Sequence, residues 1–227
     1  MKTEDYTPDA ICGSLGIGVF DEPFTRGRPG QQFRMLLCPS FAPELSITLT
    51  EVTAASGSPR GRSDAEITTV LLVAASRTQI WTMDKPGLVT VDHAKSENAS
   101  LTLKDLELKF RGALAAPSQS VVTLDGMPVY AVLRRYGNSI LVRETPAKDS
   151  PFGKFVAEIV NVAFSVSDNI GCQNALAHAG CYVGLDLPVE AVPEPKHSTQ
   201  VSVIGVPDDQ NELLAALAAV AGRQTRN

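Results

Sequence analysis

The sequence predicts an α+β protein, with a β-rich antiparallel sheet or sandwich over about residues 15–144 and two or three helices in the C-terminal third. Three observations lead to this prediction. Short apolar segments recur through the first two thirds of the chain. Gly, Pro and Asp-Gly turns separate them. After Pro146 the apolar residues change to helical spacing.

Length and composition agree with one folded domain. The chain has 227 residues, of which 44% are hydrophobic and 20% charged, which is ordinary for a globular protein. We expect a single domain over 1–227, with a β-rich body at 11–145. The helix-containing part, 146–227, should pack on that body because its apolar stripes need a partner.

Period-two alternation identifies the clearest strand. Leu45, Ile47 and Leu49 alternate with Ser and Thr, which predicts a strand over 45–50 with one polar face. Shorter apolar runs predict further strands, at Leu15–Phe20, Phe33–Cys38, Ile67–Ala75, Thr78–Met83, Leu106–Phe110 and Ser139–Arg143.

Two turn signals organise the end of the β-rich body. Asp125-Gly126 separates the apolar runs 120–124 and 127–134, and both turn residues tolerate positive φ, so we expect a hairpin there. Gly137-Asn138 predicts a second turn, leading into the strand at 139–143.

The C-terminal third shows helix start and stop signals. Ser150 is a candidate N-cap with Pro151 at the first helical position, and apolar residues follow at helical spacing through Ala163. A second helix is expected over 171–179, closed by Gly180 and followed by a strand at 181–187. The last predictions are a strand at 201–206 and a helix through Ala221 whose apolar stripe is Leu213, Leu214, Leu217 and Val220.

Charge and cysteine content bound the class of protein. A net charge of −5 excludes a globally basic nucleic-acid binder. Residues 1–10 lack the apolar core of a secretory signal, and no stretch reaches the roughly 18–20 apolar residues of a membrane-spanning helix. Four cysteines are too few for a disulfide scaffold and suit a reducing compartment. We therefore expect a soluble, cytoplasmic or otherwise intracellular protein.

Cys172, His178 and Cys181 form the densest group of metal-ligating residue types. Two thiols and an imidazole within ten residues supply three ligands of the kind that zinc prefers. Their spacing matches no recognised zinc pattern. The alternative is that small buried thiols pack in an Ala- and Gly-rich interface.

Basic residues gather between 134 and 154. Arginines and lysines beside Tyr130 and Tyr136 suit contacts to phosphates with a base stacked on a ring, or contacts to an anionic membrane. Charged side chains on edge strands also protect a sheet from aggregation, which is the alternative explanation. The residues of this predicted basic surface are Arg134, Arg135, Arg143, Lys148 and Lys154.

No residue group has the spacing of a catalytic or cofactor motif. The sequence lacks a Walker lysine, a Gly-x-Gly-x-x-Gly fingerprint and a Gly-x-Ser-x-Gly elbow. An enzyme is therefore less expected than a non-catalytic protein, and no cofactor is assigned.

The favoured function is interaction or self-assembly, as a homo-oligomer or with a protein partner. The composition, rich in Ala, Val, Thr, Ser, Pro and Gly, is similar to that of virion structural proteins of the capsid or matrix type. One alternative is a small enzyme or metal-binding domain centred on Cys172. The other is a nucleic-acid or anionic-membrane binder using the Arg134–Lys154 surface.

Overall fold

The computed structural model describes residues 6–21, 31–53, 67–82, 89–97, 101–115 and 125–190. They all belong to the compact unit Met1–Val192, and the second unit, Pro193–Asn227, lies outside them. The expectation of one domain over the whole chain therefore stays a prediction. The described elements are α1 (Pro8–Ser14), β1 (Gln32–Leu37), β2 (Leu45–Thr53), β3 (Ile67–Ser76), β4 (Val91–Glu97), α2 (Leu103–Ala115), β5 (Val129–Arg135), β6 (Asn138–Glu144), α3 (Pro151–Val166) and α4 (Ile170–Tyr182).

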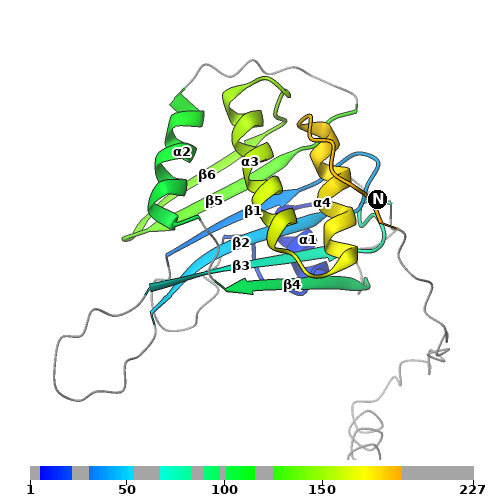
Figure 1. Ribbon diagram of the computed structural model, residues 1–227, viewed down its shortest axis with the longest axis horizontal. Coiled ribbons are helices and arrows are strands. Elements are labelled where there is room, and N and C mark those ends of the chain that lie inside the picture. The colour runs from blue at the N-terminus through cyan, green and yellow to red at the C-terminus, as the bar shows by residue number, and fades with distance from the viewer. Residues whose placement is uncertain are drawn as a thin grey trace, which may run out of the picture. The chain divides into compact units, whose positions relative to one another are not determined.

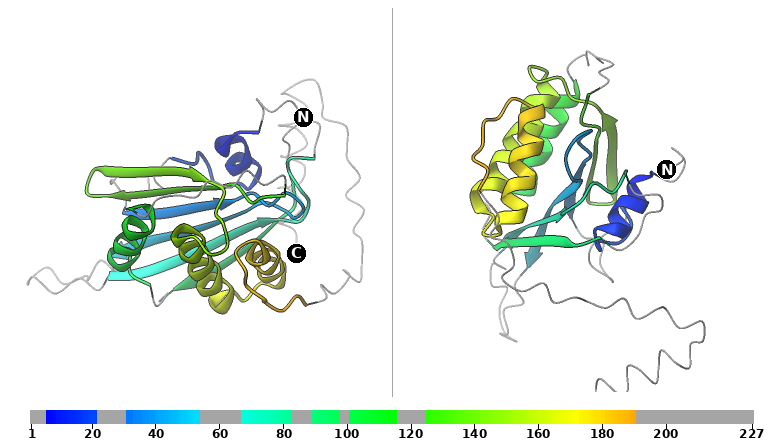
Figure 2. Two further views of the ribbon diagram at one scale, coloured as in Figure 1. Left: turned by 90° about the horizontal axis from the view of Figure 1, so that it is seen from above. Right: turned by 90° about the vertical axis from the view of Figure 1, so that its right-hand side faces the viewer.

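The strands form one antiparallel sheet in the order β4-β3-β2-β1-β5-β6. Helices α2, α3 and α4 cover one face, and α1 lies on the other (Figures 1 and 2). The predicted α+β, β-rich antiparallel class is confirmed, and it takes the form of a single sheet rather than a sandwich.

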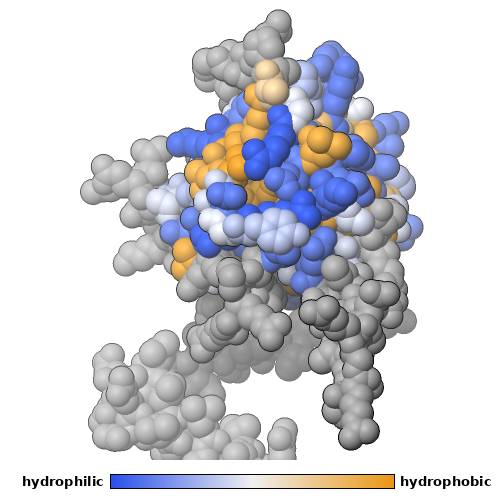
Figure 3. Space-filling view, turned by 90° about the vertical axis from the view of Figure 1, so that its left-hand side faces the viewer, coloured by the Kyte–Doolittle hydropathy of each residue, from blue (hydrophilic) through white to orange (hydrophobic). Residues whose placement is uncertain are grey.

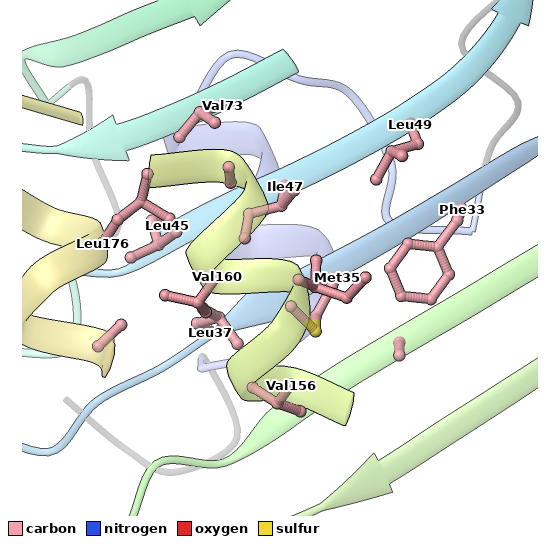
Figure 4. Close-up of a cluster of buried hydrophobic side chains, with 14 of the residues drawn as sticks. Phe33, Met35, Leu37, Leu45, Ile47, Leu49, Val73, Val156, Val160 and Leu176 are labelled. Carbon is pink, nitrogen blue, oxygen red and sulfur yellow. The ribbon is translucent and has the colours of Figure 1, made fainter. Parts of the chain in front are cut away.

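Strand β1 lies at the centre of the sheet and is buried on both faces. Because successive side chains of a strand point to opposite faces, Phe33, Met35 and Leu37 enter the core beneath α3 and α4 (Figure 4). Leu36 enters a second, smaller core with Ile11 of α1. The uninterrupted burial of β1 thus follows from helices on both sides of it.

The predicted helix starts are confirmed for α3. Ser150 is its N-cap, accepting a hydrogen bond from Gly153 N at 2.9 Å, and Pro151 is at the first helical position. Helix α4 begins after the N-cap Asn169 and is longer than predicted. Gly180 lies inside α4, and the left-handed residue is Gly184, with φ of 83°.

Two predicted strands, 15–20 and 78–83, are wrong, because backbone N–H groups in these segments donate to side-chain carboxylates and not to a neighbouring strand. Residues 15–20 follow α1, which begins at the N-cap Thr7, and Phe20 N donates to Asp9 Oδ1 at 2.9 Å. The described part of the Thr78–Met83 segment is irregular, since Ile80 N and Trp81 N donate to the carboxylate of Glu44.

The strand predicted at Leu106–Phe110 is part of α2. Thr102 caps this helix by accepting from Asp105 N at 3.1 Å. Leu103, Leu106 and Phe110, spaced by three and four residues, are buried, whereas Leu108 is exposed. In so short a segment, apolar residues at 106 and 110 fit both the period of two of a strand and the period of 3.6 of a helix. Packing against α3 favours the helix.

Half of the hairpin predicted at Asp125-Gly126, the run 120–124, lies outside the described residues. The other half contains β5, which pairs with β1 on one side and with β6 on the other. The turn predicted at Gly137-Asn138 is present one residue earlier, as a two-residue hairpin turn at Tyr136-Gly137, where φ is 49° and 81°, and it leads into β6 as expected. After α4 the chain is irregular from 185 to 190, so the strand predicted at 181–187 is wrong as well.

Two further predictions, the strand 201–206 and the final helix, fall outside the described residues. Among the helices that the structure does describe, none is long and apolar enough to cross a membrane.

Candidate functional site

Glu44, just before β2, is a completely buried carboxylate that ties three segments together. Its Oε1 accepts from Tyr6 Oη at 2.8 Å and from Trp81 N at 3.1 Å, and its Oε2 accepts from Ile80 N at 2.7 Å. Its backbone oxygen accepts from Ser76 N and Ser76 Oγ at 3.0 and 2.9 Å. One residue therefore fixes the N-terminal segment and the chain after β3 against the β1–β2 connection.

The surroundings of this carboxylate keep its neighbours protonated. Burial raises the pKa of Tyr6 far above its usual range, and nearby Cys38 and Glu44 raise it further. Burial is also the main cause of the raised pKa of the Cys38 thiol. Tyr6 therefore keeps its proton and donates a hydrogen bond to Glu44, and we call these contacts of Glu44 the clamp.

Two aromatic side chains project from the segments that Glu44 holds. Phe41 is 73% exposed and Trp81 is 48% exposed. Phe41 N donates to Tyr182 Oη at 3.1 Å, while Trp81 N is held by Glu44. Gln79 Nε2 donates to Ser40 O at 2.9 Å and joins the two segments. Both rings therefore project from backbone that is held in place.

A hollow of about 240 Å³ has in its wall two residues that hydrogen-bond to the backbone or side chain of Ser40 and Phe41. Tyr182 belongs both to its wall and to the contact that holds Phe41 N. Ser40 N and Ser40 Oγ donate to Gly126 O, also in the wall, at 3.2 and 2.6 Å. The residues that line the hollow are Asp125, Gly126, Met127, Thr145, Pro146, Ala147, Lys148 and Tyr182. We call Phe41, Trp81 and this hollow the aromatic surface.

Other large apolar side chains are exposed as well, including Leu108 of α2, Tyr136 of the β5–β6 turn and Leu141 of β6. Figure 3 shows the side that faces left in Figure 1, where apolar and hydrophilic residues intermingle. Single exposed apolar residues are common on protein surfaces. Exposure alone does not distinguish Phe41, but its position beside the hollow does.

The structure does not bring the predicted metal ligands together. Cys172 is buried, with its Sγ donating to Val73 O at 4.0 Å, and burial raises its thiol pKa to about 12. Cys181 is exposed and bonds Ala177 O at 3.4 Å. The two cysteines are nine positions apart in the helix, about two and a half turns, so their side chains point in opposite directions. His178 is exposed. Over the described ranges, no three His, Cys, Asp or Glu residues cluster to hold a metal.

The predicted basic surface is divided between the two faces of the sheet. Arg134 pairs with Asp21 at 2.7 Å, and the next residue, Arg135, pairs with Glu107 of α2 at 2.7 Å. Because they are adjacent in a strand, they point to opposite faces. Both charges have acidic partners, which leaves less positive potential for phosphate binding.

The remaining residues of that surface are on three separate elements. Arg143 of β6 stacks over the Tyr130 ring, with 5.4 Å to its centroid. Lys148 lies over Gly184, and Lys154 is exposed on α3. The predicted interaction helix with Leu213, Leu214, Leu217 and Val220 lies outside the described residues.

Sequence reasoning missed Phe41, Trp81 and Glu44. Phe41 stands between Pro39 and Pro43, and an aromatic residue in a proline-marked turn was the available signal. Trp81 was assigned to a strand. Nothing near Glu44 in the sequence indicates that its carboxylate is buried, because its partners are more than thirty residues away.

Comparison with known proteins gives no match to any protein-family model, curated protein or solved structure.

Proposed function

We propose that this protein self-associates through the aromatic surface and acts as a homo-oligomeric interaction protein. The observation that supports this proposal is that Phe41 is 73% exposed and that its backbone N donates to Tyr182, a residue in the wall of the hollow. A twofold interface uses the same patch on both subunits, so it needs a patch that complements itself. A projection next to a hollow satisfies this requirement, because each copy places its ring in the other's hollow.

The size of the hollow supports the exchange. Its volume is about 240 Å³, and a cavity of about 150 Å³ is large enough for a benzene ring. Phe and Trp are also enriched at the centres of interfaces. One phenyl ring therefore fits, with room for adjustment.

The fixed backbone of both rings supports the proposal too. Tyr182 Oη holds Phe41 N, and Glu44 holds Trp81 N. Association costs free energy when side chains and loops must be ordered, and that cost is smaller when they are ordered beforehand. The backbone that carries both rings is therefore already ordered before association.

Sedimentation velocity over a wide concentration series tests this function. We expect the wild-type mass to rise from monomer toward dimer. Phe41→Ser should weaken the dimer by at least about thirtyfold, the usual effect of losing a central aromatic contact. Filling the hollow by Ala147→Leu should weaken it as well, since in a homodimer either change removes the ring-in-hollow contact on both sides.

Leu108→Ser is the matched control, because Leu108 is 75% exposed but lies on α2, on the opposite side of the helical layer from α4 (Figure 1). It should leave association unchanged. A wild-type protein that stays monomeric at every concentration would refute self-association, as would equal effects of Phe41→Ser and Leu108→Ser. The similarity of composition to virion proteins adds no residue-level support and remains an expectation.

A further inference from the structure

The face of the sheet opposite α3 and α4 is only partly covered by α1 (Figure 2). The small core beneath α1 contains Leu36 of β1 together with Tyr130 and Val132 of β5. A cavity of about 240 Å³ lies on the same face, over β2, β3 and β4. This cavity is distinct from the hollow of the aromatic surface, since the two share no lining residue among those described.

The register of the strands arranges the cavity in two rows. One row runs Ser46, Ala74, His93 across β2, β3 and β4. The parallel row runs Thr48, Leu72, Lys95. All six residues line the cavity. Ala74 has only a methyl group, so it leaves the space between Ser46 and His93 unfilled, and two strand spacings, roughly 10 Å, separate these two residues.

The inner end of the cavity has a hydroxyl group without a partner. Ser46 is 1% exposed. Within the described part of the chain its Oγ makes no hydrogen bond. Leaving a buried hydroxyl unpaired costs free energy. A ligand that brings a hydrogen-bonding group to Ser46 recovers this cost, whereas an entirely apolar ligand does not.

The outer end of the cavity is basic. His93 and Lys95 lie on the edge strand β4, where both are exposed. No acidic residue is among the described residues that line the cavity. Lys95 Nζ donates to Glu97 Oε1 at 2.6 Å, but both side chains are more than half exposed. Exposed pairs of this kind are weak, so an anion can replace Glu97 as the partner of Lys95.

The middle and roof of the cavity are apolar. Leu72 and Ala74 form part of the floor, and Ile17 lines the cavity from the turn that follows α1, which we call the roof. Arg34, almost completely buried, donates from its Nη1 to Val19 O at 2.7 Å and to Phe20 O at 3.2 Å. This arginine holds the segment that carries the roof against the sheet.

We propose that this cavity binds a small amphipathic carboxylic acid. Its carboxylate meets Lys95 and a ring N–H of His93, its apolar body lies over Ala74 and Leu72, and a hydroxyl or carbonyl group at the far end bonds Ser46 Oγ. Drug-sized ligands occupy pockets of about 300–1,000 Å³. The smaller volume here, about 240 Å³, suits a single ring or a short chain.

The direct test titrates the full-length protein with para-hydroxyphenylpropionate, whose carboxylate and hydroxyl groups stand at opposite ends of an apolar body. Binding is followed by the protein's NMR chemical shifts. Phenylpropionate, without the hydroxyl, and para-hydroxyphenylpropionamide, without the charge, are the matched probes. We expect saturable binding of the parent acid and about tenfold weaker binding of either matched probe.

Variants assign the contacts. Ser46→Ala should weaken para-hydroxyphenylpropionate about tenfold and leave phenylpropionate unchanged, since only the former reaches the hydroxyl. Lys95→Gln should weaken both acids and leave the amide unchanged, whereas Glu97→Gln should strengthen both acids by releasing Lys95. The control is Lys109→Gln, because Lys109 is an exposed lysine paired with Glu158 elsewhere; it should change no affinity.

Several results would overturn the proposal. They are the absence of saturable shifts with the parent acid, equal effects of Lys95→Gln and Lys109→Gln, and a loss of phenylpropionate binding in Ser46→Ala equal to that of the hydroxylated acid. Thermal unfolding of ligand-free Ser46→Ala supplies a separate readout. Its midpoint should equal or exceed that of wild type, because the unpartnered hydroxyl does not stabilise the fold, and a clear fall would contradict this.

Discussion

The phenolic oxygen of Tyr6 lies 2.8 Å from Oε1 of Glu44 and donates a hydrogen bond to it, thirty-eight residues away in the chain. The carboxylate also accepts from two backbone N–H groups, those of Ile80 and Trp81. Because Glu44 is wholly buried, water cannot replace a lost partner. The clamp should therefore contribute strongly to stability and hold the aromatic surface in place.

Replacing this carboxylate by an amide tests the clamp. Glu44→Gln substitutes an NH₂ group, which cannot accept from Ile80 N or Trp81 N, for one acceptor oxygen. We expect the free energy of unfolding to fall by about 2–3 kcal/mol, measured by urea denaturation. Glu158→Gln, at a half-exposed carboxylate on α3, should change it by less than about 0.5 kcal/mol. Equal effects of the two substitutions would show that the clamp adds no stability.

The helical assignment of α2 predicts a contrast between two of its residues. Phe110 is buried, with ring centroids 5.5 Å from Phe33 and 5.3 Å from Phe155, whereas Leu108 is 75% exposed. Phe110→Ala should destabilise the protein by about 3–5 kcal/mol because it leaves a cavity. Leu108→Ala should change the free energy of unfolding by about 0.5 kcal/mol or less. Thermal and urea unfolding measure both, and a large effect at Leu108 would contradict the helix.

Two glycines should respond to alanine with opposite signs. Gly112 is an exposed residue inside α2, and a Cβ there meets nothing within 4 Å. Gly112→Ala should stabilise by about 0.5–1 kcal/mol. Gly137 has φ of 81° in the β5–β6 turn, so Gly137→Ala should destabilise by about 1–2 kcal/mol. Urea unfolding measures both, and each variant is the control for the other. If both substitutions changed the free energy of unfolding in the same direction, the backbone conformation described for these two glycines would be contradicted.

The buried thiols predict a loss of stability at alkaline pH. Burial raises the pKa of Cys12 and Cys172 to about 12 each. An unfolded thiol releases its proton near pH 8.5. Between about pH 9 and 12 the folded state therefore binds more protons than the unfolded state, so the free energy of unfolding falls as pH rises. Urea unfolding from pH 7 to 10.5 measures this, and Cys172→Ala should reduce the slope.

Thiol labelling gives a related and simpler readout. Cys181 is exposed, whereas Cys12, Cys38 and Cys172 are buried. A soluble disulfide reagent at pH 8 should modify Cys181 in the folded protein and the other three after unfolding. The control is Cys181→Ser, which should react only when unfolded. Rapid reaction of all four thiols in the folded protein would contradict the burial described above.

Local signals predicted part of the fold. Alternation of Leu45, Ile47 and Leu49 identified β2, and Ser150-Pro151 identified the start of α3. The pair Thr102 and Asp105 favours a helix start, but the period-two alternation of the next few residues predicts a strand, and only the structure shows that α2 is helical. For the candidate sites, the sequence supplied residue types but not their proximity, because Arg134 and Arg135 separate onto opposite faces.

The sequence by itself determined the α+β class, the strands β1, β2 and β3, and the N-cap of α3, because periodicity and capping depend on residues within a few positions of one another. Only the tertiary structure decided that 103–115 is helical, that Glu44 joins Tyr6 to Trp81, and that Ser46, Ala74 and His93 line one cavity. Those features arise from strand register and burial between segments distant in the chain, and burial sets which backbone and side-chain groups must find partners.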